Sequence, residues 1–89
     1  MIRWTCFLSG RVQGVGMRFT VRKLADEFRL HGYVENLDDG RVCMVLEGQA
    51  DLLQRFLDQL RVEAPGHLHT IDTYPSEASG EFANFSIRR

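Results

Sequence analysis

Apolar residues recur at two spacings along this chain, and the spacing distinguishes strands from helices. In residues 2–9 every second side chain from Ile2 to Leu8 is apolar or a cysteine, and only Phe7 interrupts the alternation. A period of two is typical of a half-buried strand, because successive side chains point to opposite faces of a sheet. We therefore predict a strand over residues 2–9.

Two later segments have the period of a helix. From about residue 17 to 31, and again from about 50 to 62, apolar residues fall three and four positions apart, as in a helix with one buried face. We predict that Gly32 is the left-handed C-terminal cap of the first helix and that Pro65-Gly66 ends the second. The predicted buried positions are Val21, Leu24, Ala25 and Phe28 in the first helix and Leu52, Leu53, Phe56, Leu57 and Leu60 in the second.

The remaining segments alternate again. Residues 33–48 predict two strands joined by a tight turn at Asp39-Gly40, a dipeptide that tolerates positive φ. Residues 67–74 and 82–88 predict two more strands, separated by a polar turn. The second strand of the predicted hairpin has one apolar face, made of Val42, Met44 and Leu46.

The order of these elements is βαββαβ with an extra C-terminal strand. In such a chain each right-handed crossover leaves room for another strand between the two that it joins. We expect a ferredoxin-like α/β sandwich of the α+β class, a single domain over residues 1–89, with two helices on one face of an antiparallel sheet. The first two strands then run the same way, so the loop after the first and the end of the second meet at one edge of the sheet.

Charge and hydropathy exclude several classes of protein. The 89 residues carry a formal net charge of −1, whereas domains that bind a nucleic-acid backbone usually have a strong basic excess. No apolar run approaches the roughly 18 residues of a membrane span, and the N-terminal segment alternates where a signal peptide would be continuously apolar. We expect a cytoplasmic protein without a nucleic-acid or membrane partner.

Cysteine and histidine spacing predicts neither a disulfide nor a metal site. Cys6 and Cys43 lack any CxxC or Cys/His pattern, and we expect two reduced thiols packed in or on the sheet. His67 and His69 point the same way on a predicted strand, but no third ligand is visible, so solvent-facing alternation explains them better. No metal or cofactor is predicted.

The stretch SGRVQGVGMRFT, residues 9–20, is the richest in chemistry. We expect its three glycines, Gly10, Gly14 and Gly16, to form a loop, because glycine destabilises regular elements. Backbone N–H groups of such a loop, next to the partial positive charge of a helix N-terminus, can bind an anion. Arg18 could close the site with a planar fork suited to phosphate. From these residues alone, a structural turn bearing a surface arginine is an equal alternative.

The wider sequence favours the anion site. GRVQGVGMR (10–18) and GYVENLDDGRV (32–42) closely resemble the two signature regions of the acylphosphatase family, a G-R-V-Q-G-V-x-x-R loop and a G-x-V-x-N strand leading into a D-G turn. The resemblance covers the whole chain, as far as the terminal FANFSIRR. Members more often have phenylalanine where Met17 stands, and many have an aromatic residue in place of Gly16. Neither change removes a polar group.

The resemblance implies a metal-free hydrolase that converts an acyl phosphate, as small-molecule substrate, into a carboxylate and inorganic phosphate. The arginine matching Arg18 holds the phosphate, and the asparagine matching Asn36 positions the attacking water. Arg11 could add charge, although a solvated residue explains it better. We expect a monomer. The loop amides implied to bind the phosphate are those of Gln13, Gly14, Val15, Gly16 and Met17.

Two other functions were considered. An RNA-binding module shares the order βαββαβ, but residues 41–48 offer none of the stacking aromatics that its central strands need. An acylphosphatase-like domain that binds a ligand or carbamoyl phosphate without independent turnover is the closer alternative, since the carbamoyltransferases of hydrogenase maturation carry such a domain. This chain has one domain only, and we therefore expect an enzyme.

Overall fold

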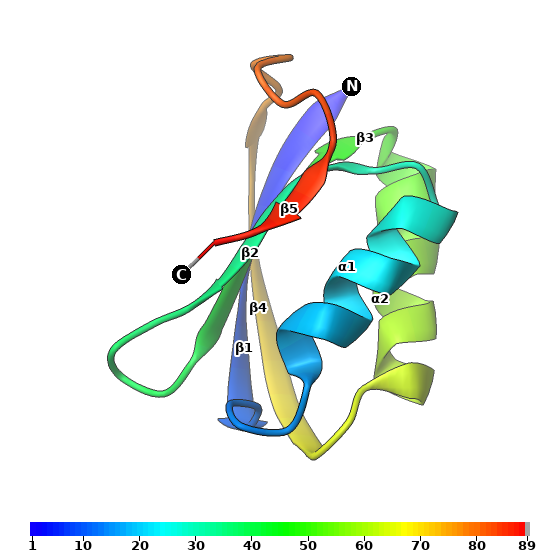
Figure 1. Ribbon diagram of the computed structural model, residues 1–89. Helices are drawn as coiled ribbons and strands as arrows, with labels where there is room; N and C mark the ends of the chain where they lie inside the picture. The colour runs from blue at the N-terminus through cyan, green and yellow to red at the C-terminus, as the bar shows by residue number, and fades with distance from the viewer. Residues whose placement is uncertain (89) are drawn as a thin grey trace.

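Two helices cover one face of a five-stranded sheet in the computed structural model, which describes residues 1–88 (Figure 1). The strand order β4-β1-β3-β2-β5 confirms the ferredoxin-like fold predicted from the sequence. Neither helix is long and apolar enough to cross a membrane. The elements are β1 (Ile2–Arg11), α1 (Met17–Glu27), β2 (His31–Asn36), β3 (Val42–Gly48), α2 (Ala50–Glu63), β4 (His67–Glu77) and β5 (Phe85–Ile87).

The sheet is antiparallel except at one edge. Strand β3 pairs antiparallel with β1 and β2, and β1 pairs antiparallel with β4. Strand β5 instead runs parallel to β2, with Gly32 opposite Phe85. The reason is the path of residues 78–84, which cross the sheet at the end where β2 begins, so β5 starts beside the start of β2 (Figure 1).

The pairing brings two distant segments to one edge of the sheet. Leu8 of β1 and Asn36 of β2 both lie opposite Val42 of β3, one on each side of it. The loop after β1 and the end of β2 therefore meet, as predicted. The turn between β2 and β3 is also where the sequence placed it, and Gly40 has a φ of 94°.

The core lies between the sheet and the helices. Cys6 and Leu8 are fully buried, and the rings of Phe28 and Phe56 join the two helices edge to face at 5.9 Å. Cys6 lies opposite Met44, whereas Cys43 lies opposite Phe7, so the two free thiols are on opposite faces of the sheet. This arrangement prevents a disulfide between them and agrees with two cysteines packed in the sheet.

The end of α1 differs from the prediction. The helix stops at Glu27, and Gly32 is not its cap but lies in β2, where any side chain would collide with the carbonyl oxygen of Val45. Arg29 takes the left-handed conformation instead, with a φ of 56°. Its N–H donates to the Asp26 carbonyl, and Leu30 N–H donates to Ala25, which is a Schellman motif. The reversal turns Leu30 into the core.

Gly10 also lies elsewhere than predicted. It is inside β1 rather than in the loop, because the register between β1 and β4 shifts between Ser9 and Gly10. A bulge of this kind accepts glycine within a strand. The loop proper therefore begins after Arg11.

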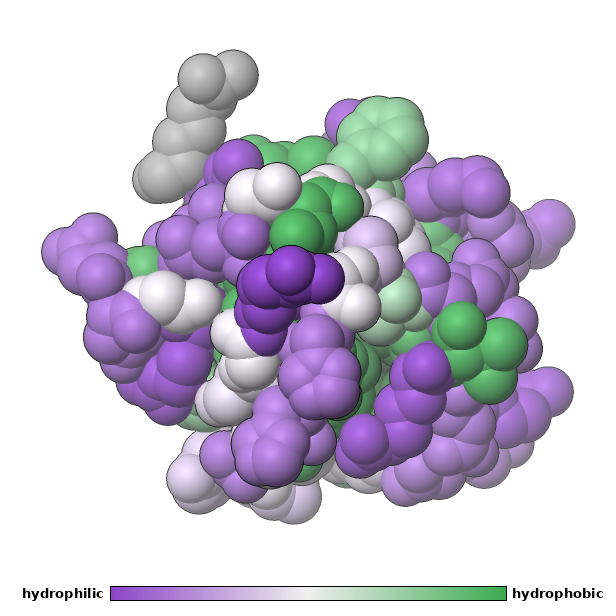
Figure 2. All heavy atoms as spheres, turned by 90° about the horizontal axis from the view of Figure 1, so that it is seen from below, coloured by the Kyte–Doolittle hydropathy of each residue, from purple (hydrophilic) through white to green (hydrophobic). Residues whose placement is uncertain are grey.

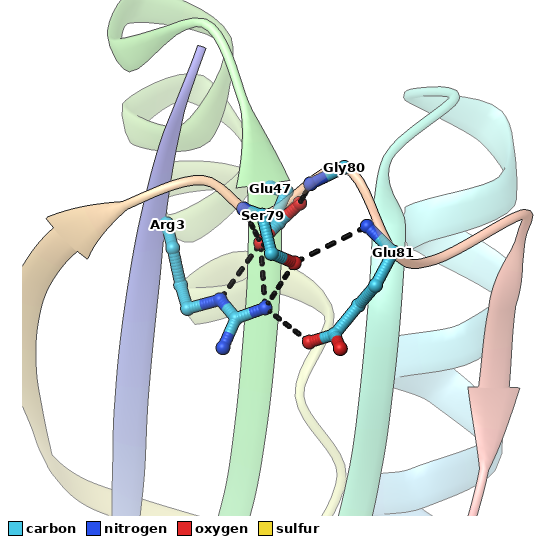
Figure 3. Close-up of polar contacts among 5 residues, drawn as sticks. All are labelled: Arg3, Glu47, Ser79, Gly80 and Glu81. Carbon is cyan, nitrogen blue, oxygen red and sulfur yellow. Dashed lines mark hydrogen bonds and ion pairs between the residues drawn. The ribbon is translucent and has the colours of Figure 1, made fainter.

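Glu47 is the one buried charged side chain among the described residues, with 2% of its surface exposed. Figure 3 shows why it is tolerated: donors of Arg3, Ser79 and Gly80 surround its carboxylate. Arg3 Nε donates to Oε2 at 2.7 Å, and the backbone N–H groups of Ser79 and Gly80 donate at 2.9 and 3.0 Å. Arg3 also bonds to Glu81 at 2.6 Å. The carboxylate thus ties residues 79–81 to the centre of the sheet.

These contacts also set the acidity of Glu47. Burial by itself would raise the pKa of its carboxyl, but the hydrogen bonds from Ser79, Gly80 and Arg3 outweigh burial and lower the pKa to about 2. Because the pKa in the folded protein is below the ordinary value of 4.5, the contacts stabilise the fold fully above that value. The stabilisation is lost as the pH falls towards 2.

We expect Glu47→Gln to lower the free energy of unfolding at neutral pH by about 1.5–3 kcal/mol, because an amide is a weaker acceptor than a carboxylate for these donors. Chemical denaturation at neutral pH, repeated in acid, measures this. The variant should also lose less stability than the wild type between about pH 5 and pH 2. Glu77→Gln, at an exposed position of β4, is the matched control. Equal losses in both variants would contradict the assigned role.

Candidate active site

The segment between β1 and α1 presents backbone donors that have no acceptor among the described residues. Among residues 1–88, the N–H groups of residues 13–17 take part in no hydrogen bond. Thr20 N–H is the first of the helix to bond back, to the Gly16 carbonyl at 3.1 Å. Unpaired backbone N–H groups need water or a ligand, and here they precede a helix N-terminus that carries partial positive charge. The segment is therefore suited to an anion.

Two glycines give this loop its shape. Gly14 has a φ of 73°, and Gly16, the residue that caps α1, has a φ of 86°. Residues with a side chain rarely adopt such values, so glycine is required by conformation. Apart from the glycine itself and its two chain neighbours, no described atom lies within 4 Å of where a Cβ would stand at either position. The loop is thus shaped by backbone preference rather than by crowding.

A side chain that the sequence analysis did not single out holds the loop in place. Gln13 Nε2 donates to the carbonyl oxygen of Leu37 at 2.7 Å and to that of Arg41 at 2.9 Å. Both acceptors belong to the turn between β2 and β3, so one amide group ties the glycine loop to the hairpin that follows Asn36. The sequence predicted only a backbone role for Gln13, because the acceptors lie 24 and 28 positions away.

A cleft of about 660 Å³ lies between the loop, the start of α1 and the ends of β2 and β5. It brings together five of the predicted site residues, whereas the side chain of Gln13 is bonded to the hairpin and Val15 packs against the core. Arg11 is exposed and does not line the cleft. The lining residues are Val12, Gly14, Gly16, Met17, Arg18, Phe19, Asn36 and Ile87.

The two predicted polar side chains, those of Arg18 and Asn36, make few hydrogen bonds to residues 1–88. Arg18 Nη1 makes one long hydrogen bond, to the carbonyl oxygen of Arg88 at 3.4 Å. The amide of Asn36 makes none within the described part of the chain, and both side chains are half-buried. Their remaining donors are available to a molecule in the cleft.

Figure 2 looks at the end of the molecule that carries the loop. White and green patches, of near-neutral and apolar residues, lie in the middle of this view, interrupted and surrounded by purple, hydrophilic residues. Met17 is 2% exposed and Val12 1%, so the floor of the cleft is apolar. Hydrogen bonds to an anion are stronger against such a floor than in open water.

Histidines 67 and 69 lie side by side on β4, as the alternation predicted. Their rings stack with centroids 6.2 Å apart, and both are exposed. Within residues 1–88 no group of three or more His, Cys, Asp or Glu side chains is arranged to hold a metal ion.

Comparison with known proteins identifies the family. The family model described as acylphosphatase matches residues 4–87. The chain belongs to the acylphosphatase family. An acylphosphatase of Deinococcus radiodurans is 45% identical over 80 residues, covering 89% of this chain and 92% of that protein. As the family resemblance implied, this acylphosphatase-family chain is an enzyme that hydrolyses acyl phosphates.

Solved structures agree with the fold. The crystal structure of acylphosphatase from Bacillus subtilis matches with a TM-score of 0.91 at 34% identity, covering 100% of both chains. The crystal structure of HypF from T. kodakarensis also matches, with a TM-score of 0.88 at 28% identity. There the match covers 100% of this chain but 12% of the other. The acylphosphatase fold thus forms the whole chain in the first of these structures and a small part of the chain in the second.

The geometry around Gln13 predicts an order of two substitutions. Gln13→Ala removes both hydrogen bonds and should cost about 1 kcal/mol of stability. Gln13→Glu should cost more, because a carboxylate has no donor for the Leu37 and Arg41 carbonyl oxygens and repels them. Both should weaken inorganic phosphate binding, since the loop loses its attachment. Thermal melting and calorimetric titration with phosphate measure the two effects.

Gln54→Ala, at an exposed position on α2, is the control for Gln13. If Gln13→Glu were as stable as Gln13→Ala and bound phosphate normally, the hydrogen bonds from Gln13 to the hairpin would not be needed for phosphate binding.

Proposed function

We propose that this acylphosphatase-family enzyme binds the phosphate of its substrate on the N–H groups of residues 13–17 and on the Arg18 guanidinium. The observation that carries the proposal is the set of loop N–H groups without a protein acceptor, in the same cleft as Arg18 and Asn36. A phosphate group has enough oxygens to accept from several of these donors at once. The helix N-terminus and Arg18 supply the positive charge that its negative charge requires.

Asn36 then positions the attacking water. Its amide stands at the end of β2, carries both donors and an acceptor, and is not engaged by another described residue. Phosphoryl transfer places the attacking and leaving oxygens roughly in line, so catalysis depends mainly on holding the water and the phosphate in that geometry. The amide oxygen of Asn36 can accept a hydrogen bond from the water and so hold it in line.

The reaction needs no acid or base from the protein. The water oxygen forms a bond to phosphorus as the bond between phosphorus and the acyl oxygen breaks, and that electron pair leaves on the carboxylate. A carboxylate whose conjugate acid has a pKa of about 4 leaves without protonation. The proton of the water passes to a phosphoryl oxygen of the substrate. The products are a carboxylate and inorganic phosphate.

Further properties follow from the same proposal. The enzyme works without a metal ion or cofactor, because Arg18 and the loop provide the charge stabilisation. It acts as a monomer in the cytoplasm, without a nucleic-acid partner. The large exposed apolar side chains support a monomer, since they are spread over different elements rather than gathered in one patch. They are Met1, Phe19, Val62 and Tyr74.

The alternative is an acylphosphatase-like domain that binds a phosphate compound without turning it over. This chain also matches 12% of a much longer protein, so the fold can form one part of a larger protein. Release of phosphate from benzoyl phosphate by the purified chain distinguishes the two, because a binding domain would be saturated by the compound and leave it intact.

Substitutions at Arg18 and Asn36 should give different kinetic results. Arg18→Gln removes charge from both bound substrate and transition state, so KM should rise and kcat should fall. Asn36→Ala should lower kcat by about 10²–10³, the usual cost of losing one preorganised polar group, with phosphate inhibition little changed. Steady-state kinetics with benzoyl phosphate and inhibition by inorganic phosphate measure both.

Matched controls exist for both positions. Arg55 on α2 and Asn84 before β5 are exposed, so Arg55→Gln and Asn84→Ala should retain wild-type kinetics. Thermal melts show whether each variant is folded. If folded Asn36→Ala had a normal kcat, Asn36 would not position the water. If Arg18→Gln bound phosphate normally, Arg18 would not belong to the phosphate site.

We also expect hydrolysis to be unaffected by EDTA. The charge of the phosphate is met by Arg18 and by backbone donors, so no divalent ion is required for its binding. The rate of phosphate release is measured before and after exhaustive chelation, and again after adding Mg²⁺ or Zn²⁺. Loss of activity on chelation and its return with one of these ions would show that the proposed charge balance is wrong.

A further inference from the structure

Phe19 is the large apolar side chain that the active-site cleft leaves open to solvent. It lies in the first turn of α1, directly after Arg18, and 68% of its surface is exposed. Its side chain lines the cleft and also a smaller groove of about 240 Å³ on the outer surface of α1. Arg22, Lys23 and Asp26 form the rest of that groove. Phe19 therefore stands between the phosphate site and a second hollow.

The in-line geometry of the displacement places the acyl group on the side of the cleft where Phe19 lies. In an in-line displacement the leaving oxygen is opposite the attacking water. Asn36, which positions the water, belongs to the wall of the cleft made by the sheet. Phe19 belongs to α1 and lines the cleft on the side of the helix layer. With the phosphate fixed between these walls, the leaving acyl group extends to the side of α1.

We infer that Phe19 is a specificity-determining residue, on which the acyl group of the substrate packs. This inference rests on the proposed function, because it takes the position of the phosphate from the loop. An aromatic ring offers a flat apolar surface, so acyl phosphates with a flat apolar acyl group, such as an aromatic ring, are favoured over those with a small one. Packing of two rings contributes free energy beyond the area that it buries.

The charges of the groove extend the inference to the far end of the acyl group. Arg22 Nε lies 3.8 Å from Asp26 Oδ2, which offsets part of its charge. Lys23 forms no ion pair within residues 1–88. The groove therefore has a positive excess, and an acyl group that ends in a carboxylate is preferred over an uncharged one of the same shape.

The test compares substrates within each variant. For Phe19→Ala, the ratio of kcat/KM for benzoyl phosphate to that for acetyl phosphate should fall about 2- to 10-fold, whereas Phe19→Tyr should keep the wild-type ratio. Tyr74→Ala, at an aromatic position on β4 with 59% exposure, is the matched control and should leave the ratio unchanged. Inorganic phosphate has no acyl group, so its inhibition constant should change little in Phe19→Ala.

A second comparison tests the groove. In Lys23→Gln, the preference for 4-carboxybenzoyl phosphate over benzoyl phosphate should fall about 2- to 5-fold at low salt, and the difference should shrink at high salt. If Phe19→Ala kept the benzoyl to acetyl ratio, the acyl group would not pack on Phe19. If Lys23→Gln kept its preference, the acyl group would not reach the groove.

Failure of the proposed function would look different from failure of this inference. In the first case Arg18→Gln would bind phosphate normally, and the inference would be overturned together with the site. In the second case Arg18→Gln would be impaired as expected, while the substrate ratio of Phe19→Ala stayed at the wild-type value. The exposure of Phe19 makes loss of folding an implausible cause of either result, and a thermal melt checks it.

Discussion

The burial of β3 on both faces is the constraint from which the rest of this structure follows. A helix layer covers one face, but a central strand with Cys43, Val45 and Glu47 on the other face also needs a cover there. At the Glu47 end of that face the chain provides the cover with its own C-terminal part, which crosses the sheet and is held by the Glu47 carboxylate (Figure 3). Phe82 continues the cover by packing edge to face against Tyr33. A buried charge with several hydrogen-bond donors thus fixes the path of the chain after β4.

That path reaches the active site. After crossing the sheet, the chain pairs with β2 and places Ile87 in the lining of the cleft and the Arg88 carbonyl within reach of Arg18. The cleft of this acylphosphatase therefore has three walls from distant parts of the sequence: the loop with the start of α1, the end of β2, and β5. The loop is attached to the hairpin by Gln13, so two of these walls are also joined directly. The geometry of the candidate site in this way depends on several strands of the sheet.

Local patterns in the sequence account for much of this. Alternation and helical spacing predicted every element, and the signature residues predicted that Arg18 and Asn36 would share a site. The features that the sequence did not predict are of two kinds. Some depend on contacts between residues far apart in the sequence, and others on which of several neighbouring residues adopts a given backbone conformation. Glu47 resembles any strand-end glutamate until Ser79 and Gly80 fold onto it, and the acceptors of Gln13 become visible only when the hairpin is in place. The left-handed residue after α1 is Arg29 although a glycine stands nearby, because the core requires Leu30 at that point.

The empty space beside Gly14 and Gly16 has a consequence for chirality. At both positions φ is positive and no atom is close enough to obstruct a Cβ. What excludes other residues is therefore the handedness of L-amino acids, which costs about 1–2 kcal/mol per residue in this conformation. A D-amino acid has the opposite preference and adopts these angles without strain. D-alanine introduced at these two positions by chemical synthesis would meet no strain from the backbone angles, and it would remove the conformational freedom that glycine gives to the unfolded chain. The mirror-image residue, which ribosomes do not supply, therefore suits the backbone angles of Gly14 and Gly16 better than an L-residue with a side chain does.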